Sequence, residues 1–158
     1  MNILVLGGDG YLGWPTAMHL SSHGHNVAVV DNYLRRNLCT EQKVNILHAV
    51  PKLEERVAIW KKKSGNTIRV FEGDLNDWGF VAEMFQAFVP DGVVHYAEQP
   101  SAPYSMINRE TAFLTLQNNL GVTFNTIQAV RQFSPDAHIV KLGTMGEYGT
   151  PNIDIEEG

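Results

Sequence analysis

Short apolar runs alternate with amphipathic stretches along most of the chain. Five segments are rich in β-branched and leucine residues, as buried strands are: residues 2–8, 26–31, 67–74, 92–97 and 138–144. Three segments between them repeat apolar residues at roughly helical spacing: residues 11–23, 80–88 and 110–133. Repeated strand–helix–strand units predict an α/β fold, in which helices cover both faces of a parallel sheet.

The connection between the second and third expected strands is longer than the others. Residues 33–66 exceed a plain crossover, and their apolar pattern predicts a helix from Leu53 to Lys63. We interpret residues 33–66 as an insertion specific to one family of proteins. Residues 1–158 then form a single domain, because a chain of this length can bury one core.

Composition narrows the class of protein and its compartment. The formal net charge of −5 argues against a nucleic-acid-binding surface, which needs excess positive charge. Cys39 is the only cysteine, so the chain cannot form an internal disulfide and a reducing compartment is expected. The first apolar run is too short for a signal peptide or a membrane span, and we expect a cytoplasmic protein without a membrane partner.

Three glycines follow the first expected strand in the pattern G-x-x-G-x-x-G. Gly7 permits a tight turn, Gly10 lets the backbone approach a pyrophosphate, and Gly13 lets the next helix pack closely on the strand. The free N–H groups at the start of that helix would face the phosphates. With the strand–helix order, this motif predicts a Rossmann-type doubly wound sheet and a dinucleotide site that includes Tyr11 and Leu12. A glycine-rich turn without a ligand is the alternative.

Asp31 ends the second expected strand, about 20 residues after the glycines, as the dinucleotide fingerprint requires. Its carboxylate should accept a hydrogen bond from a ribose 2′-hydroxyl and repel a 2′-phosphate, which favours NAD over NADP. We assign Asp31 and the adjacent Asn32 to the cofactor site. Arg35 and Arg36 are also candidates, because arginines at this place can hold a phosphate. They could equally be a solvated pair or contact a sugar phosphate.

Asp74 follows the third expected strand, in the stretch GDLND. Its carboxylate could bind the amino group of an adenine, with Leu75 packed on the ring. Helix capping is an equal alternative, since Asn76 and Asp77 are also good caps.

Two later stretches resemble the UDP-sulfoquinovose synthase family of the extended short-chain dehydrogenase/reductase superfamily. They are VVHYAEQPSAPYSMINR at residues 93–109 and KLGTMGEYGTPNIDIEEG at residues 141–158. The resemblance extends to GGDGYLGWPTA, DNYLRR and the insertion. It implies an enzyme that binds NAD tightly and converts UDP-glucose and sulfite to UDP-sulfoquinovose. The implied steps are oxidation at C4, loss of water across C5 and C6, addition of sulfite at C6, and reduction at C4.

The resemblance also implies roles for residues near the end of the chain. Thr144 matches the Ser or Thr that hydrogen-bonds the C4 oxygen of the sugar. Related dehydratases follow this residue with an acid pair, but Met145 and Gly146 stand there in this chain. We therefore expect Glu147 to be the acid or base and Met145 to contact substrate; a surface carboxylate is the alternative for Glu147.

The catalytic tyrosine of the superfamily is followed four residues later by lysine. Asn152 stands four residues after Tyr148, and none of the tyrosines in the 158 residues begins a Y-x-x-x-K motif. In the family this motif and most of the UDP-sugar-binding domain lie further along the chain. We therefore expect residues 1–158 to be the N-terminal, NAD-binding part of a longer enzyme, inactive by themselves, with a sheet that is incomplete at its C-terminal end.

The loop after the fourth expected strand supplies further candidates. Ala97 should lie against the cofactor, and Asn119 matches an Asn that the family places near the active site. Gln99 and Ser101 could contact substrate or sulfite, although a rigid prolyl turn would need no ligand. His95 is expected to be buried in its strand, as is His138, and no metal site is expected.

Three functions remain open. The first is a UDP-sulfoquinovose synthase, with a UDP-sugar and sulfite as partners, and the second is a related nucleotide-sugar epimerase or dehydratase. The third is a dinucleotide-binding module without catalysis, which the missing Y-x-x-x-K favours. Because the fifth expected strand would lie at a sheet edge, we also expect a homodimer or association with a missing C-terminal part.

Overall fold

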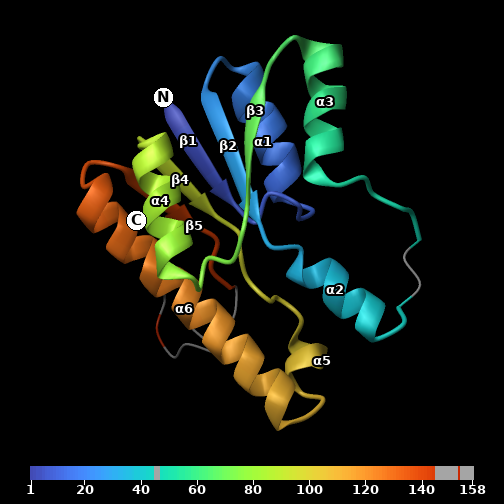
Figure 1. The fold of residues 1–158 in the computed structure, drawn as a ribbon. Helices are drawn as coiled ribbons and strands as arrows, with labels where there is room; N and C mark the ends of the chain where they lie inside the picture. Colours follow the sequence, from blue (N-terminus) through green and yellow to red (C-terminus); the bar gives the residue numbers. More distant parts are fainter. Residues whose placement is uncertain (45–46, 145–152, 154–158) are drawn as a thin grey trace.

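The computed structural model describes residues 1–44, 47–144 and 153. In this part of the chain five strands form one parallel sheet in the order β3-β2-β1-β4-β5 (Figure 1). The strands are β1 (Asn2–Leu6), β2 (Asn26–Asp31), β3 (Ile68–Glu72), β4 (Gly92–His95) and β5 (His138–Lys141). The central place of β1 and the helices on both faces confirm the predicted Rossmann-type fold.

Helices cover the two faces of the sheet. On one face lie α1 (Gly13–Ser22) and α3 (Leu53–Ser64), and on the other α4 (Trp78–Phe88) and α6 (Arg109–Phe133) (Figure 1). Two shorter helices, α2 (Leu34–Glu41) and α5 (Ala102–Ser105), lie beyond the carboxyl ends of the strands. In the described part of the chain, no helix is both long and apolar enough to cross a membrane.

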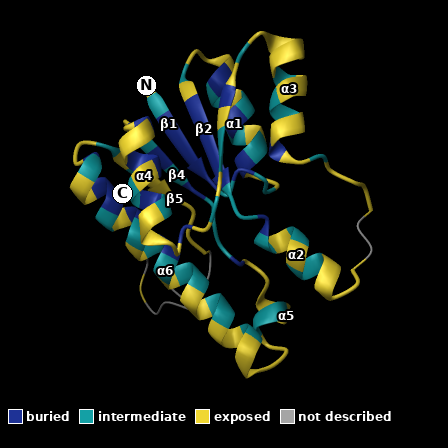
Figure 2. Ribbon diagram, in the orientation of Figure 1, coloured by how far each residue is buried: buried dark blue, intermediate teal, exposed yellow. Residues whose placement is uncertain are grey.

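The core consists of one apolar cluster on each side of the sheet. Because successive strand side chains point to opposite faces, Leu4 and Leu6 pack against α4 and α6, whereas Val5 packs against α1 and α3. The sheet is therefore buried on both faces (Figure 2). This explains why β1 and β2 read as continuous apolar runs instead of alternating ones.

The ends of α4 follow from local side-chain chemistry. The carboxylate of Asp77 accepts hydrogen bonds from the N–H groups of Gly79 and Phe80, so Asp77 is the N-cap that the sequence allowed. The helix begins at Trp78, two residues earlier than its apolar pattern indicated. It ends at Phe88, and the next residue, Val89, adopts the left-handed conformation with φ 48°.

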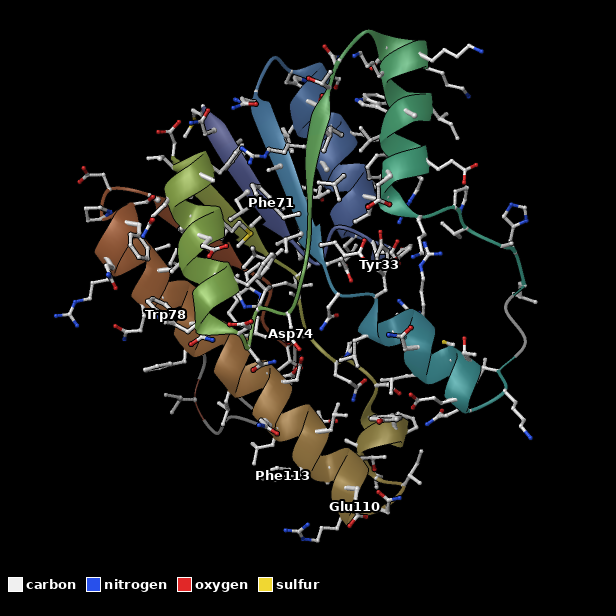
Figure 3. The ribbon with its side chains drawn as sticks, in the orientation of Figure 1. Tyr33, Phe71, Asp74, Trp78, Glu110 and Phe113 are labelled. Atoms are coloured by element: carbon white, nitrogen blue, oxygen red, sulfur yellow. The ribbon has the colours of Figure 1, made fainter. Side chains whose placement is uncertain are left out.

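The expected helix in the insertion starts at Leu53, as predicted, and α2 precedes it. Tyr33 lies where the insertion leaves β2, and it is buried between the sheet and α3 (Figure 3). The N–H of Leu53 donates to the Tyr33 hydroxyl at 3.2 Å. This bond attaches the start of α3 to Tyr33, which lies two positions after the end of β2.

Strand β5 lies at one edge of the described sheet, as expected for the fifth strand. It is poorly covered, since Val140 and Leu142 are half exposed. The prediction that His138 is buried is wrong, because its place at the start of this edge strand exposes it. His95, on the neighbouring β4, is buried as predicted.

The side chain of Phe85, on α4, is fully buried in the larger core cluster. A substitution at this position therefore tests how much the cluster stabilises the fold. Replacing it with alanine removes this apolar volume and leaves a cavity. We expect Phe85→Ala to lower the free energy of unfolding by about 3–5 kcal/mol, measured by urea denaturation of nucleotide-free protein. Tyr11→Ala, at an aromatic side chain that is 82% exposed, should change it by less than about 0.5 kcal/mol. Equal effects of the two substitutions would contradict this placement of the core.

Candidate functional site

The glycine loop turns directly from β1 into α1. Gly7 has φ +84°, a conformation that side chains rarely adopt, and a Cβ at Gly13 would lie 2.0 Å from the Gly7 carbonyl oxygen. Gly10 lies on the outside of the turn, where an added Cβ would meet only that carbonyl, at 3.2 Å. Tyr11 and Leu12 are exposed beside it. The loop is thus tight on its inner side and open on its outer side.

The start of α1 has no side-chain cap, although the N–H of Trp14 donates to the Gly10 carbonyl at 3.3 Å. Its N-cap residue, Leu12, makes no side-chain capping hydrogen bond, and the first turn of the helix contains no acidic residue. The N–H groups at such a helix start attract anions. Within the described residues, the loop and helix start therefore leave no carboxylate in the first turn that would repel an anion.

Asp31 lies beside this turn at the carboxyl end of β2. Its carboxylate accepts hydrogen bonds from the N–H groups of Asp9, at 2.9 Å, and Tyr33, at 2.8 Å. Burial raises the pKa of Asp31 above its ordinary value, and the two N–H donors oppose that shift. The adjacent Asn32 accepts a hydrogen bond from the N–H of Leu34 at 3.0 Å, so it also shapes the entry to α2.

The two arginines after β2 have different surroundings. Arg35 is exposed, as the solvated reading of the pair expects. Arg36 instead points back to the glycine loop, where it forms an ion pair with Asp9 at 2.6 Å. The two arginines are thus not equivalent candidates for a phosphate.

The Asp74 carboxylate accepts hydrogen bonds from the backbone N–H and the side-chain amide of Asn76, at 2.8 and 3.1 Å. It is exposed after the carboxyl end of β3 (Figure 3). Leu75 is only 5% exposed and packs in the core cluster with α4. The capping role belongs to Asp77, so Asp74 keeps an open surface, whereas the Leu75 side chain serves the core.

The loop after β4 meets the glycine loop and α6. Ala97 lies against Gly7, since a Cβ on that glycine would come within 2.9 Å of the Ala97 nitrogen. The Asn119 side chain accepts a hydrogen bond from the N–H of Gln99 at 2.9 Å and donates one to the Gln99 carbonyl at 3.2 Å. Asn119 therefore fixes the path of this loop from its place on α6.

The expected contact between Gln99 and substrate is not supported. The Gln99 side chain is buried, with 6% of the residue exposed, and its amide donates to the Ser101 carbonyl and to the Thr115 hydroxyl, the latter at 2.8 Å. Its amide oxygen accepts from the N–H of Ser101 at 2.7 Å. These bonds give Gln99 a loop-shaping role. Ser101 is exposed, and its hydroxyl accepts from the N–H of Tyr104 at the start of α5.

Thr144 is exposed three residues after β5. Like the glycine loop after β1, it follows the carboxyl end of its strand. Parallel strands bring their carboxyl ends together, and the N–H of Leu142 reaches the His95 carbonyl at 3.3 Å. The topology therefore brings Thr144 to the edge where Gly7 and Ala97 meet. Met145 and Glu147 lie outside the described residues.

An ion pair and a buried imidazole lie at the carboxyl ends of β4 and β5, near Thr144 in the chain. Lys141 pairs with Glu98. His95, beneath them, is 1% exposed, its Nε2 lies 3.4 Å from the Thr123 hydroxyl, and its Nδ1 has no hydrogen-bond partner among the described residues. Burial lowers the pKa of His95 to about 4, and the positive charge of Lys141 adds to the shift.

The described residues contain no group of three or more His, Cys, Asp and Glu side chains that could hold a metal ion. The glycine turn, the start of α1 and the Asp31 carboxylate lie together at the carboxyl ends of β1 and β2. A family model described as the NAD dependent epimerase/dehydratase family matches residues 3–158. The chain belongs to this family.

Two epimerase/dehydratase relatives are similar along almost the whole chain. UDP-sulfoquinovose synthase, chloroplastic, from Spinacia oleracea is 50% identical over 156 residues, which are 99% of this chain and 32% of the relative. UDP-sulfoquinovose synthase from Sulfolobus acidocaldarius is 46% identical over 157 residues, covering 99% of this chain and 40% of the relative. The chain thus spans 32% and 40% of the length of these two relatives.

Solved structures of the same kind support the fold. UDP-glucose 4-epimerase from Bifidobacterium longum, in complex with NAD+ and UDP, superposes with a TM-score of 0.75. The match covers 97% of this chain and 40% of that protein, with 22% sequence identity. At this identity the likeness concerns the fold alone.

Sequence reasoning missed two features of this epimerase/dehydratase site. Asp9 was an unassigned residue within the glycine motif, and Arg56 a charge on the helix of the insertion, yet the two form an ion pair. An acidic residue inside a glycine-rich loop was the only signal in the sequence. Arg56 is 47 positions away from Asp9 in the chain, so this pairing depends on the fold.

His95 should make the stability of the domain depend on pH. Between its ordinary pKa of 6.5 and about 4, the unfolded chain binds a proton that the folded chain excludes, so stability falls as the pH drops through this window. The loss is at most about 3 kcal/mol. We expect urea unfolding at pH 7 and pH 4.5 to show a smaller loss for His95→Gln than for the original protein. Equal losses would contradict the assignment of this pH dependence to His95.

Proposed function

We propose that residues 1–158 form the nucleotide-binding part of an NAD-dependent nucleotide-sugar enzyme of the UDP-sulfoquinovose synthase type. The observation that carries this proposal is the identity of 50% and 46% with two UDP-sulfoquinovose synthases, across 99% of the chain. A UDP-glucose 4-epimerase from Lacticaseibacillus casei is 29% identical over a similar span. The proposed reaction joins UDP-glucose and sulfite and releases water.

The geometry at the carboxyl edge supports NAD as the cofactor. The open side of Gly10 and the start of α1 suit a pyrophosphate, and the Asp31 carboxylate suits a ribose diol. Bound NAD would accept a hydride from the sugar and later return it. Gly7 and Ala97 then bring the loop after β4 against the cofactor site.

Thr144 is the proposed hydrogen-bonding group for the C4 oxygen of the sugar. It is exposed three residues after β5, on the side of the sheet where the parallel strands end, and this supports the proposal. A hydroxyl there can hold the oxygen as its charge changes during oxidation and reduction. Glu147 remains the predicted acid or base, and Met145 a predicted substrate contact. The Tyr and Lys of the family motif are not within residues 1–158.

The activity test is incubation of the whole protein with UDP-glucose and sulfite, followed by detection of UDP-sulfoquinovose by mass spectrometry. We expect Thr144→Ala to lower kcat by about 100-fold, because it removes a hydrogen bond to the reacting oxygen. Thr144→Ser keeps the hydroxyl and should retain most of the activity. Formation of UDP-galactose without sulfite incorporation would favour the epimerase alternative. NAD binding without turnover would favour the non-catalytic module.

The outer face of α6 supports self-association. Five large apolar residues at helical spacing are exposed along it: Phe113, Leu116, Leu120, Phe124 and Ile127. The residues that α6 buries against its own sheet lie on another side, and Phe113 lies far from the sheet (Figure 3). We propose a second copy as the occupant, because a twofold axis can place this apolar face against itself. Further residues of a longer chain are the alternative occupant.

Light scattering coupled to size-exclusion chromatography checks this association. We expect a dimer for the original protein and a monomer for Leu120→Glu, because the new charge would be buried between two apolar faces. Gln132→Glu adds the same charge to an exposed part of α6 outside the apolar face and should remain dimeric. A monomer of the original protein at every concentration would exclude a second copy.

A further inference from the structure

A partly buried ion cluster links the glycine loop to the insertion. Asp9, between Gly7 and Gly10, accepts two hydrogen bonds from Arg36: Nε donates to Oδ2 at 2.6 Å and Nη2 donates to Oδ1 at 2.7 Å. Arg56, on α3, also pairs with Oδ1 of Asp9 and donates to its backbone carbonyl at 3.2 Å. A carboxylate inside the proposed phosphate-binding loop thus holds two guanidinium groups.

The guanidinium of Arg36 has little capacity for another anion. Besides its two bonds to Asp9, it donates to the backbone carbonyls of Val50, at 2.6 Å, and Pro51, at 2.8 Å. It also lies over the ring of Tyr33, with 5.4 Å between the guanidinium carbon and the ring centre. Arg36 is therefore fixed in place by the carboxylate on one side and the insertion on the other.

Arg56 is even more enclosed. Only 10% of its side chain is exposed, and the guanidinium lies over the ring of Trp14 at 5.0 Å. Its Nε has no hydrogen-bond partner in the described part of the chain. The Asp9 carboxylate, itself 11% exposed, is therefore the counterion of a buried charge.

The cluster lies next to the acceptor proposed for the ribose. The backbone N–H of Asp9 donates to Oδ2 of Asp31, so one residue contacts both arginines through its side chain and the ribose acceptor through its backbone. Two carboxylates and two guanidinium groups give the cluster no net charge. A ribose diol carries no charge and therefore suits a neutral cluster. A 2′-phosphate needs a cation, and both guanidinium groups of the cluster are already paired.

We propose that Asp9 determines the choice of cofactor, because it engages Arg36 and Arg56 and so withholds them from the 2′-phosphate of NADP. This inference rests on the proposed binding of NAD. In it, exclusion of NADP needs two carboxylates: Asp31 at the ribose and Asp9 at the arginines. Arg35, exposed on the same helix, has no part in the exclusion.

The experiment measures the dissociation constants of NAD+ and NADP+ for nucleotide-free protein by isothermal titration calorimetry. In Asp9→Asn the carboxylate is lost with little change of shape, so Arg36 becomes free to form a bidentate pair with a phosphate. We expect the affinity for NADP+ to rise about tenfold or more, and that for NAD+ to change by less than about threefold. Adenosine 2′,5′-bisphosphate should gain affinity in parallel, since it carries the same 2′-phosphate.

Two further variants test whether the freed Arg36 causes the gain in NADP+ affinity. Asp9→Asn combined with Arg36→Ala should lose the gain in NADP+ affinity. This double variant still lacks the Asp9 carboxylate, but it has no Arg36 guanidinium to bind the 2′-phosphate. Lys62→Ala, which removes an exposed charge from α3, the helix of Arg56, should leave both dissociation constants unchanged. A gain that survives removal of Arg36 would overturn the proposed role of the Asp9–Arg36 pair.

A folded variant is needed for this test, and Asp9→Asn leaves the Arg56 charge buried without its counterion. If circular dichroism shows that it does not fold, Asp9→Asn with Arg56→Met removes both buried charges and still frees Arg36. This double variant should show the same gain for NADP+. Unchanged NADP+ affinity in a folded variant that still binds NAD+ would overturn the inference alone. Absence of NAD+ binding by the original protein would overturn the proposed function as well.

Discussion

The close approach of α1 to the end of β1 is the constraint on which the site depends. The chain must reverse between Leu6 and Gly13, and the first residue of α1 lies so near the Gly7 carbonyl that a Cβ would come within 2.0 Å of it. Two consecutive N–H groups of the loop, those of Gly7 and Gly8, also donate to the Val30 carbonyl, at 2.9 and 3.0 Å. The turn is thereby held against β2, and the start of α1 is brought beside Asp31.

Charge extends this constraint from the loop to the insertion. Asp9 ties α2 and α3 to the glycine turn through Arg36 and Arg56, whose guanidinium groups lie over the rings of Tyr33 and Trp14. The cost of burying these charges is offset only while all three remain paired. The insertion is therefore part of the architecture of the site, since displacing either helix would disturb the loop beside the ribose acceptor.

The other half of the carboxyl edge is organised by neutral hydrogen bonds. Asn119 on α6 holds the backbone of the loop after β4, and Gln99 closes that loop on itself and on Thr115. Gln99 is buried and Asn119 is partly buried, and both side-chain amides have partners for their donors and acceptors, which favours one conformation of the loop. The same loop lies against Gly7. The loop after β4 is thus fixed beside the glycine turn, at the carboxyl ends of β1 and β4.

Local pattern determined much of the fold and part of the site. The apolar runs of β1 and β2, the Asp77 cap, the glycine turn and Asp31 depend on neighbouring residues or on the period of the chain, so the sequence alone indicated them. Long-range pairing decided the rest. The sequence suggested that Gln99 contacts substrate and could not pair Asp9 with Arg56, because these contacts join residues that are distant in the chain or depend on the path of a loop. His138 is exposed because β5 lies at the edge of the described sheet. The order of the strands, which is a property of the tertiary structure, puts β5 there.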